Sequence, residues 1–471
     1  MLRPRKPAMS RRRMLKCAAA LTAIGPVFQA TRGELSAQTK QSGPNRNSAP
    51  SDLKITDIRA CLVASNFDYP IIRIDTNQGV YGLGECFAGS TMAAALVLKA
   101  HLLGKNPLHI DEILGNYGRN PGIRGSAGQD FWNTGYGAVD LALHDISGKV
   151  YGVPAWRLLG NKLRDHVAIY CDTTETTDPK EYGKRMAARK AKGYKNFKMD
   201  LFTSLVKDRP GAVMPSGIAT DKGLQYLCEF IAAAKDAIGW EMPLACDHEG
   251  APSMALNLPV PDAIRYARAF EPYNLAWAED LLDWRDWRGY QKVRNASTTR
   301  LATGELAFGL EEAFMNLIDN NAIDVLHPDI IASGGLREIK RIADYAHAKG
   351  IKSAIHQPGS PIGQIAAAHL AATMPNFTVC ETHAIDIPWW NDLVTGLPKP
   401  LIQDGYVAVP DTPGLGMELN EAVVKEHLRY PEYFAPTTMF DRWSYTLGPI
   451  VPRGPWPHYK ADGTLCNCAE E

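Results

Sequence analysis

The sequence has few cysteines, no excess charge of either sign and no long apolar run, and each absence excludes a class of protein. Nine cysteines among 471 residues are an odd number without regular spacing, unlike a small domain built on disulfides. Lysine plus arginine and aspartate plus glutamate both number 51, and no basic stripe follows the first fifty residues. Nucleic acid and anionic membranes are therefore not expected partners. The apolar run of residues 17–30 is too short to span a bilayer in the mature protein.

Composition and length are those of a large globular protein. Hydrophobic residues make up 45% and charged residues 22% of the chain, as in ordinary globular proteins. A length of 471 residues is enough for three domains, or two if one is a barrel. Four cysteines lie inside strand-like apolar runs, where cysteine behaves as a small hydrophobe, and two lie in the polar C-terminal tail. These are Cys61, Cys171, Cys246 and Cys380, then Cys466 and Cys468.

The first fifty residues differ from the rest. Ser10-Arg11-Arg12-Arg13-Met14-Leu15-Lys16 precedes the apolar run, and small residues follow it up to a potential cleavage site near Ala37. This pattern predicts a twin-arginine export signal over residues 1–37, a polar linker over 38–52 and a periplasmic location. A disordered basic tail is the alternative. Twin-arginine export carries folded proteins, which suits a large protein with buried thiols.

The remaining chain alternates strand and helix signals in three regions. Residues 53–165 read as three strands followed by helices, one of them over 132–151, and predict an α+β domain. Residues 166–382 alternate eight short strands with helices, which predicts a (β/α)₈ barrel. Residues 201–220 form an insertion expected at the barrel mouth, and residues 383–471 are assigned to the first domain or to a surface wrap. The expected strands are 167–171, 196–200, 243–247, 276–279, 301–305, 324–327, 352–356 and 378–381.

Three acidic residues close three successive apolar runs in the middle of the chain. Asp247, Glu279 and Glu305 are separated by 32 and 26 residues, each about one strand–helix unit. The carboxyl ends of barrel strands meet on one face, so three carboxylates there repel one another unless a divalent cation lies between them. Oxygen ligands favour Mg²⁺, with Mn²⁺ as the alternative. Any single acid could instead cap a helix or pair with an arginine.

A histidine and two further acids end later strands. His356 ends the seventh strand, and Asp329 follows the sixth in His327-Pro328-Asp329. A carboxylate beside an imidazole fixes its tautomer and raises its basicity, which is the arrangement of a general base. A structural histidine is the alternative. Glu381 ends the eighth strand and is expected to face the same cavity.

Three more charged residues lie at the ends of strands two and three. Lys198 and Asp200 are two apart, so both point to one side of their strand, where the lysine can neutralise a substrate carboxylate or pair with Asp200. Glu249 lies two residues after Asp247, and it fits an acid, a substrate contact or a group behind the first ring of ligands.

Taken together, these motifs resemble the enolase superfamily, in the mandelate racemase and sugar-acid dehydratase branch. The resemblance covers residues 54–419. Its motifs are Gly82-Leu83-Gly84-Glu85, residues 138–149, residues 154–160, the acidic trio, Pro328-Asp329-Ile330 with Gly334-Gly335, His356 and Glu381.

The resemblance implies an α+β capping domain over a modified (β/α)₈ barrel, and a magnesium-dependent reaction. It implies that Asp247, Glu279 and Glu305 bind Mg²⁺, and that the His356–Asp329 pair removes the proton α to a substrate carboxylate. Glu381 then contacts that carboxylate or the enediolate. Loss of the β-hydroxyl gives a 2-keto-3-deoxy acid, the reaction of a galactonate/gluconate dehydratase-like hydro-lyase.

The chain departs from the family pattern in two places. Racemases and cycloisomerases of the family carry Lys-x-Lys on strand two, where this chain has Asp200 in place of the second lysine. Some galactonate- and mannonate-type dehydratases carry a histidine acid where this chain has Glu249. Either Glu249 or His356 is then the proton donor to the leaving hydroxyl.

We therefore expect an exported, Mg²⁺-dependent homo-oligomeric dehydratase acting on an aldonate or aldarate. Residues 65–69 and 120–124 of the capping domain are expected to set specificity, with Trp389 and Trp390 near the same cavity. One alternative is a racemase or epimerase with Asp200 or Glu249 as second base. The other is a non-catalytic sugar-acid binding protein.

Overall fold

The computed structural model describes residues 52–90, 92–115, 129–248 and 258–442. The leader, the linker, residues 120–124, Glu249, Cys466 and Cys468 lie outside this part, so the expectations for them stay predictions. No helix of the described part is both long and apolar enough to cross a bilayer.

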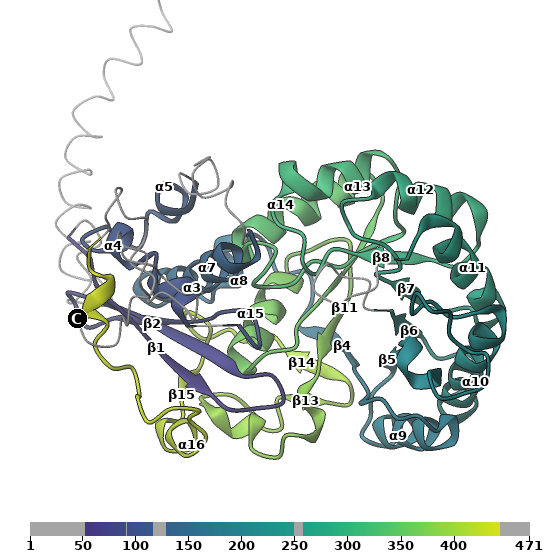
Figure 1. Cartoon of the computed structure of the whole chain (residues 1–471). Coiled ribbons are helices and arrows are strands. Elements are labelled where there is room, and N and C mark those ends of the chain that lie inside the picture. The colour runs from purple at the N-terminus through teal and green to yellow at the C-terminus, as the bar shows by residue number, and fades with distance from the viewer. Residues whose placement is uncertain (1–51, 91, 116–128, 249–257, 443–471) are drawn as a thin grey trace, which may run out of the picture. The chain divides into compact units, whose positions relative to one another are not determined.

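The first domain is a three-stranded antiparallel sheet with helices on it (Figure 1). Strand β3 lies very close to helix α7: a Cβ on Gly82 or Gly84 would approach the carbonyl oxygens of Ala142 and Ala138 to 2.1 and 2.0 Å. Only glycine fits there, which explains the Gly-Leu-Gly part of the motif. The elements are β1 (Ile55–Val63), β2 (Tyr69–Thr76), β3 (Tyr81–Glu85), α3 (Ala93–Leu96), α4 (Lys99–Leu102), α5 (Ile110–Gly115), α7 (Gln129–Tyr151) and α8 (Trp156–Leu159).

Eight parallel strands form the second domain, and pairing of the last with the first closes them into a barrel. The predicted barrel is confirmed, and every expected strand is present within a few residues of its predicted bounds. The strand of residue 305 ends earlier, at Thr303. The strands are β4 (His166–Cys171), β5 (Asn196–Asp200), β6 (Leu244–Asp247), β7 (Trp277–Glu279), β8 (Leu301–Thr303), β9 (Val325–Leu326), β10 (Lys352–Ile355) and β11 (Phe377–Thr382).

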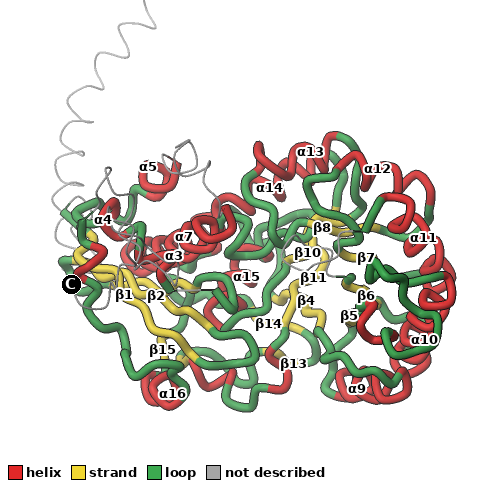
Figure 2. Tube along the Cα trace, in the orientation of Figure 1, coloured by secondary structure: helices red, strands yellow, loops and turns green. Residues whose placement is uncertain are grey.

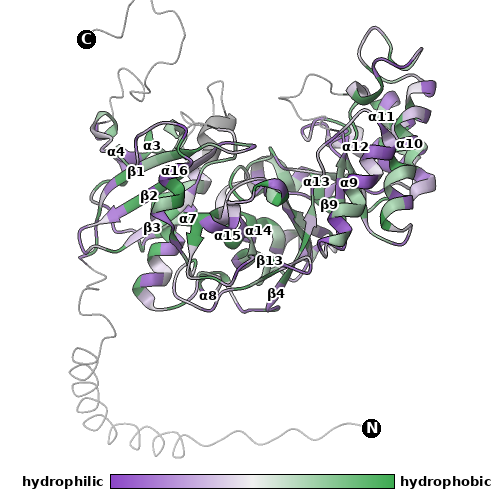
Figure 3. Cartoon of the chain, turned by 90° about the horizontal axis from the view of Figure 1, so that it is seen from below, coloured by the Kyte–Doolittle hydropathy of each residue, from purple (hydrophilic) through white to green (hydrophobic). Residues whose placement is uncertain are grey.

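Helices surround the strands, as Figure 2 shows with red around yellow. Several begin at a side chain that accepts a hydrogen bond from the first turn, including Asp178, Thr220, Asp286 and Ser360. Purple and green residues interleave along the helices in Figure 3, as expected where one helix face is buried and the other meets water. The helices are α9 (Pro179–Ala191), α10 (Asp221–Ile238), α11 (Val260–Phe270), α12 (Trp287–Ala296), α13 (Met315–Asp319), α14 (Gly335–Ala348) and α15 (Pro361–Ala371).

After the eighth strand come two short 3₁₀ turns, Ala384–Asp386 and Trp390–Leu393, and then a further strand, so no α-helix directly follows this strand. The chain then forms β12 (Val394–Thr395), β13 (Ile402–Gln403), β14 (Tyr406–Ala408), β15 (Glu418–Leu419) and α16 (Glu421–Glu426). Strand β14 pairs with the start of β4, while Val63 of β1 forms a bridge with Leu428. The C-terminal segment therefore contacts both domains, whereas the sequence predicted only the first domain or a surface wrap.

Two further expectations concern buried segments. The insertion of residues 201–220 contains a 3₁₀ turn (Thr203–Val206), and the Ala219 amide donates to the Tyr266 hydroxyl of α11 at 2.9 Å. The end of the insertion at Ala219 thus contacts the outer helix α11. The four strand cysteines are buried free thiols, as predicted.

Candidate active site

The acidic trio lies at the carboxyl ends of three neighbouring strands. Register pairs Asp247 of β6 with Glu279 of β7, and Glu279 with Ala302 of β8. Glu305 follows two residues after the end of β8. Glu279 is fully buried and Asp247 is 5% exposed, so these carboxylates have given up most of their hydration.

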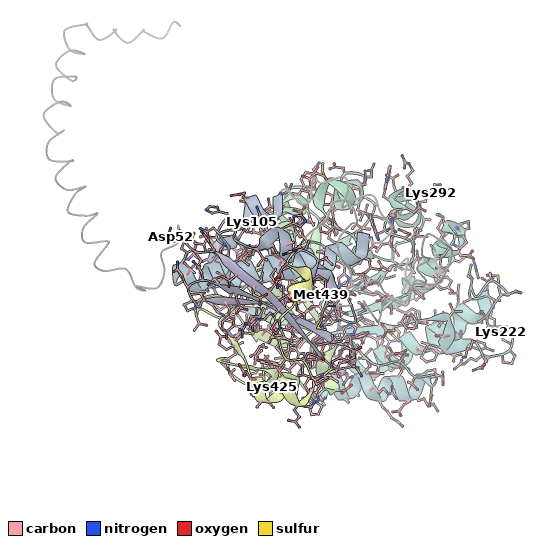
Figure 4. The ribbon with its side chains drawn as sticks, turned by 60° about the vertical axis from the view of Figure 1, so that its left-hand side comes forward. Asp52, Lys105, Lys222, Lys292, Lys425 and Met439 are labelled. Atoms are coloured by element: carbon pink, nitrogen blue, oxygen red, sulfur yellow. The ribbon has the colours of Figure 1, made fainter. Side chains whose placement is uncertain are left out.

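Lys198 of β5 is the cation among these acids. Its ammonium Nζ lies 2.8 Å from Asp247, 3.1 Å from Glu279 and 3.0 Å from Glu381. Burial would lower the pKa of Lys198, but the three carboxylates raise it well above the ordinary value. Exposed lysines such as Lys222 point outward in Figure 4, whereas Lys198 is 1% exposed. Its ion pairs run to these acids and not to Asp200.

One face of the trio has ligand atoms arranged for a metal ion. Glu279, Glu305 and His327 each offer one such atom, and the three atoms lie within 4.8 Å of one another. Asp247 is not one of these three, and it pairs with Lys198 beside them. Burial, followed by the charges of Glu279 and Glu305, raises the pKa of Asp247 to about 7 even though Lys198 opposes the shift. The carboxylates thus repel one another, and the oxygen-rich donor set fits a divalent cation.

His356 and Asp329 form the predicted dyad. The Nδ1 atom of His356 donates to Asp329 Oδ2 at 2.7 Å. Asp329 is held in turn by its Oδ1, which accepts from the amides of Ile331 and Ala332 at 2.7 and 2.6 Å. Carboxylate and imidazole are therefore fixed, with Nδ1 protonated and Nε2 left to act on a ligand.

The Nε2 atom of His356 faces the acids of the site. It lies 3.3 Å from Glu305 Oε2 and 3.5 Å from Glu381 Oε2. Burial lowers the pKa of His356, but Glu305, Glu381 and Asp329 together raise it to about 10. Positive charge added beside Glu305 would lower this pKa again, because it would offset the carboxylate that contributes most to the increase.

Glu381 lies at the centre of the barrel mouth. Its Oε1 contacts Lys198 and the Nε2 atom of His383, each at 3.0 Å. Its Oε2 makes no hydrogen bond within the described residues. Burial raises the pKa of Glu381, but Lys198, His356 and His383 outweigh it and hold the pKa well below the usual range. A charged carboxylate with a free oxygen can accept a hydrogen bond from a ligand.

The other residues that the sequence predicted for the site make fewer contacts with its charged groups. Asp200 is half-buried, and its amide and carbonyl contact the Tyr182 hydroxyl. Phe67, in the predicted specificity loop, lies edge-on to His383 with ring centroids 5.5 Å apart. Trp390 is buried and donates to the carbonyl of Gly359. Trp389 stacks on His427 with centroids 4.0 Å apart. The loop of residues 65–69 therefore reaches the site through Phe67, whereas Trp390 is buried against Gly359.

Four residues of the site were not predicted from the sequence, namely Tyr170, Asp172, His327 and His383. His327 lies 3.1 Å from Glu279 and 2.6 Å from the hydroxyl of Tyr170, and His383 lies 3.5 Å from Asp172. A signal was present for the histidines, because His327 precedes Asp329 by two and His383 follows Glu381 by two. Period two places such neighbours on one side of a strand.

Comparisons with known proteins agree with this geometry. Residues 46–160 match the family described as mandelate racemase / muconate lactonizing enzyme, N-terminal domain, and residues 181–423 match the enolase C-terminal domain-like family. The chain is 31% identical over 430 residues to the D-xylonate dehydratase of Haloferax volcanii. That alignment covers 88% of this chain and 97% of the relative.

Solved structures show the same fold. A mandelate racemase/muconate lactonizing enzyme-like protein from Rubrobacter xylanophilus has a TM-score of 0.73 at 29% identity, covering 81% of this chain and 99% of that one. An enolase from Pantoea ananatis with bound D-gluconate and magnesium has a TM-score of 0.68 at 28% identity, covering 82% and 97%. The chain therefore belongs to the mandelate racemase/muconate lactonizing enzyme family of the enolase superfamily.

Proposed function

We propose that the protein is a Mg²⁺-dependent hydro-lyase that converts an aldonate or aldarate into a 2-keto-3-deoxy acid. The observation that carries this proposal is the His356–Asp329 dyad, whose Nε2 points at the carboxylates of Glu305 and Glu381 across the barrel mouth. The relative named as a D-xylonate dehydratase and the solved relative with D-gluconate and magnesium support the same substrate class.

Asp247, Glu279 and Glu305 would hold the cation, with Mn²⁺ as its substitute. A bound Mg²⁺ would act as a Lewis acid that stabilises the negative charge developing on the substrate carboxylate. Contacts within the chain hold two of these carboxylates in position. Lys198 pairs with Asp247 and Glu279, and Trp277 donates its indole N–H to the second oxygen of Glu279 at 2.7 Å. Asp247 and Glu279 are thus oriented before any cation arrives.

The chain's residues carry out the proton chemistry. The Nε2 atom of His356 takes the proton from the carbon next to the substrate carboxylate, while Asp329 keeps Nδ1 protonated and stabilises the imidazolium that forms. Glu381, with its free oxygen, accepts a hydrogen bond from a substrate hydroxyl or from a protonated carboxylate oxygen. The hydroxyl on the adjacent carbon takes up a proton and leaves as water, and the resulting enol becomes the ketone by losing its hydroxyl proton and gaining one at carbon 3.

A screen of acid sugars tests the proposal. D-Xylonate, D-gluconate, D-galactonate and D-mannonate would each be incubated with the protein plus Mg²⁺, and again with EDTA. We expect a semicarbazide-reactive 2-keto product from at least one acid, with Mg²⁺ only. Exchange of the α-proton in D₂O with recovery of an epimer and no loss of water would favour the racemase or epimerase alternative. Metal-dependent binding without turnover of any acid would favour a binding protein.

A further inference from the structure

A second histidine–aspartate pair lies beside the dyad of the proposed base. His383 directly follows β11, and Asp172 directly follows β4, the two strands that close the barrel. Register pairs Thr382 with Cys171, so the next residue of each strand is His383 on one and Asp172 on the other. Their side chains meet with His383 Nδ1 and Asp172 Oδ2 3.5 Å apart.

The two pairs are arranged alike on either side of Glu381. His356 approaches one oxygen of Glu381 with Nε2 at 3.5 Å, and His383 approaches the other with Nε2 at 3.0 Å. In both rings Nδ1 faces an aspartate, Asp329 or Asp172. The ring centroids lie 6.2 Å apart. Both Nε2 atoms therefore converge on the carboxylate that we expect to contact the substrate.

His383 also lies where the capping domain meets the barrel. The Phe67 ring packs edge-on against it, and the side-chain amide of Asn66 donates to its backbone carbonyl at 3.5 Å. The side chains of His383 and Asp172 are each 12% exposed, so neither is sealed in the core. A substrate held under residues 65–69 would come into reach of His383.

We propose that His383, oriented by Asp172, is the general acid that donates a proton to the leaving hydroxyl group. This inference rests on the proposed dehydratase function and adds a catalytic residue to it. The leaving group of a sugar acid is a hydroxide unless it is protonated, so a donor at this step accelerates elimination by about 10²- to 10⁴-fold.

The protons balance between the two dyads. His356 gains the proton from carbon 2, and the electron pair of that C–H bond forms the C2–C3 double bond as the C3–O bond breaks. His383 gives its Nε2 proton to the departing oxygen, and water leaves. His383 regains a proton from solvent, while the enol becomes a ketone by losing its hydroxyl proton and gaining one at carbon 3, which His356 can return.

The charges around His383 suit a proton donor. Burial lowers the pKa of His383, but Asp172 and Glu381 outweigh burial and raise it above its ordinary value, in the direction that suits a proton donor. The ammonium of Lys198 is held by three carboxylates. The backbone amide and carbonyl of Asp200 contact the Tyr182 hydroxyl, and Glu249 lies outside the described residues.

The test separates proton removal from loss of the leaving group. His383→Asn would be compared with the natural chain and with Glu249→Gln in three assays: dehydration of the acid turned over best, exchange of its α-proton in D₂O, and elimination from its 3-deoxy-3-fluoro analogue. Fluoride leaves with little need for a proton donor. We expect His383→Asn to lose dehydration by about 10²-fold or more while α-proton exchange and fluoride release stay within about threefold.

Asp172→Asn should show the same pattern more weakly, and His347→Asn, at an exposed position of α14, should match the natural chain in all assays. Circular dichroism verifies folding. Equal loss of exchange and of both eliminations in His383→Asn would instead make His383 a support for Glu381 and overturn the proposal, as would unchanged dehydration. If Glu249→Gln, and not His383→Asn, lost dehydration while keeping α-proton exchange and fluoride release, Glu249 would be the general acid. A natural chain that eliminates neither water nor fluoride would overturn the proposed function itself.

Discussion

At the residue scale, the acids buried at the barrel mouth outnumber the groups that neutralise them. Asp247, Glu279 and Glu381 surround one buried lysine, and the partly exposed Glu305 adds a further negative charge near Asp247. A buried ion pair adds little stability over an apolar substitute, but removal of one partner leaves an uncompensated charge and costs several kcal/mol. The arrangement is therefore suited to binding more positive charge rather than to holding the barrel together.

His356→Asn tests the proposed base. Asparagine keeps a polar group of similar volume near Asp329 but cannot take a proton, so we expect turnover to fall by at least about 10²-fold while magnesium affinity changes little. Steady-state product formation and calorimetric titration with Mg²⁺ measure the two effects. Turnover within tenfold of the natural chain would remove His356 from the role of base, and His347→Asn controls for an unrelated histidine loss.

Lys198→Met tests the neutralising role of the lysine. Methionine fills a similar volume without charge, so in EDTA we expect a loss of about 3–5 kcal/mol in the free energy of unfolding. Saturating Mg²⁺ should restore part of this loss, because the added cation offsets the same carboxylates. Urea denaturation with and without Mg²⁺ measures both terms. Lys222→Met, at an exposed position of α10, should change stability by less than about 0.5 kcal/mol.

At the scale of elements, Glu85 at the end of β3 joins the capping domain to the barrel. Its two oxygens accept from the Ser360 amide at 2.8 Å, the Ser360 hydroxyl at 2.6 Å and the Gly363 amide at 3.1 Å, all at the start of α15. A carboxylate is favoured there by the helix dipole. Burial nevertheless raises the pKa of Glu85 to about 7. The same motif glutamate that marks the family thus fastens two domains.

The raised pKa of Glu85 makes the contact between β3 and α15 sensitive to pH. Between the unfolded value of about 4.5 and the folded value of about 7, the folded protein binds more protons than the unfolded chain. The contribution of Glu85 to the free energy of unfolding is therefore fully present below pH 4.5. It is lost as the pH rises through 7, and the loss amounts to at most about 3 kcal/mol. At pH 5 the Glu85→Gln variant should be less stable than the natural chain. Between pH 5 and 8 its free energy of unfolding should fall by less than that of the natural chain. Urea titrations compare it with Glu432→Gln, an exposed control that should follow the natural slope.

The elements themselves were largely predictable because buried parallel strands are apolar throughout and end where the pattern breaks. Asp247 and Glu279 mark such breaks, and both are the last residues of their strands. The site was harder to complete. His383 and Asp172 come together only because the eighth strand closes onto the first, a contact between segments that no local periodicity records. His327 directly follows β9, but the sequence does not indicate that its ring reaches Glu279.

At the scale of the whole molecule, the export signal remains a prediction from residues 1–37. Twin-arginine transport depends on the arginine pair, so conversion of Arg11 and Arg12 to lysine should retain the protein in the cytoplasm. Cell fractionation and the mass of the mature chain measure this, and Arg13→Lys alone should leave export intact. Equal periplasmic yield from the double variant would show that the basic segment is not a twin-arginine signal.

Magnesium should stabilise the entire fold, because a ligand that binds only the folded chain shifts the unfolding equilibrium by mass action. At a concentration 100 times its dissociation constant, the gain is about 2.7 kcal/mol. The melting temperature of the natural chain should rise with Mg²⁺ concentration and return on addition of EDTA. Glu279→Gln should reduce the response, since it removes a charged ligand that Lys198 and Trp277 hold in place. Glu432→Gln should keep the full response. An equal increase in all three chains would mean that Mg²⁺ acts elsewhere on the molecule and that the acidic trio does not form the metal site.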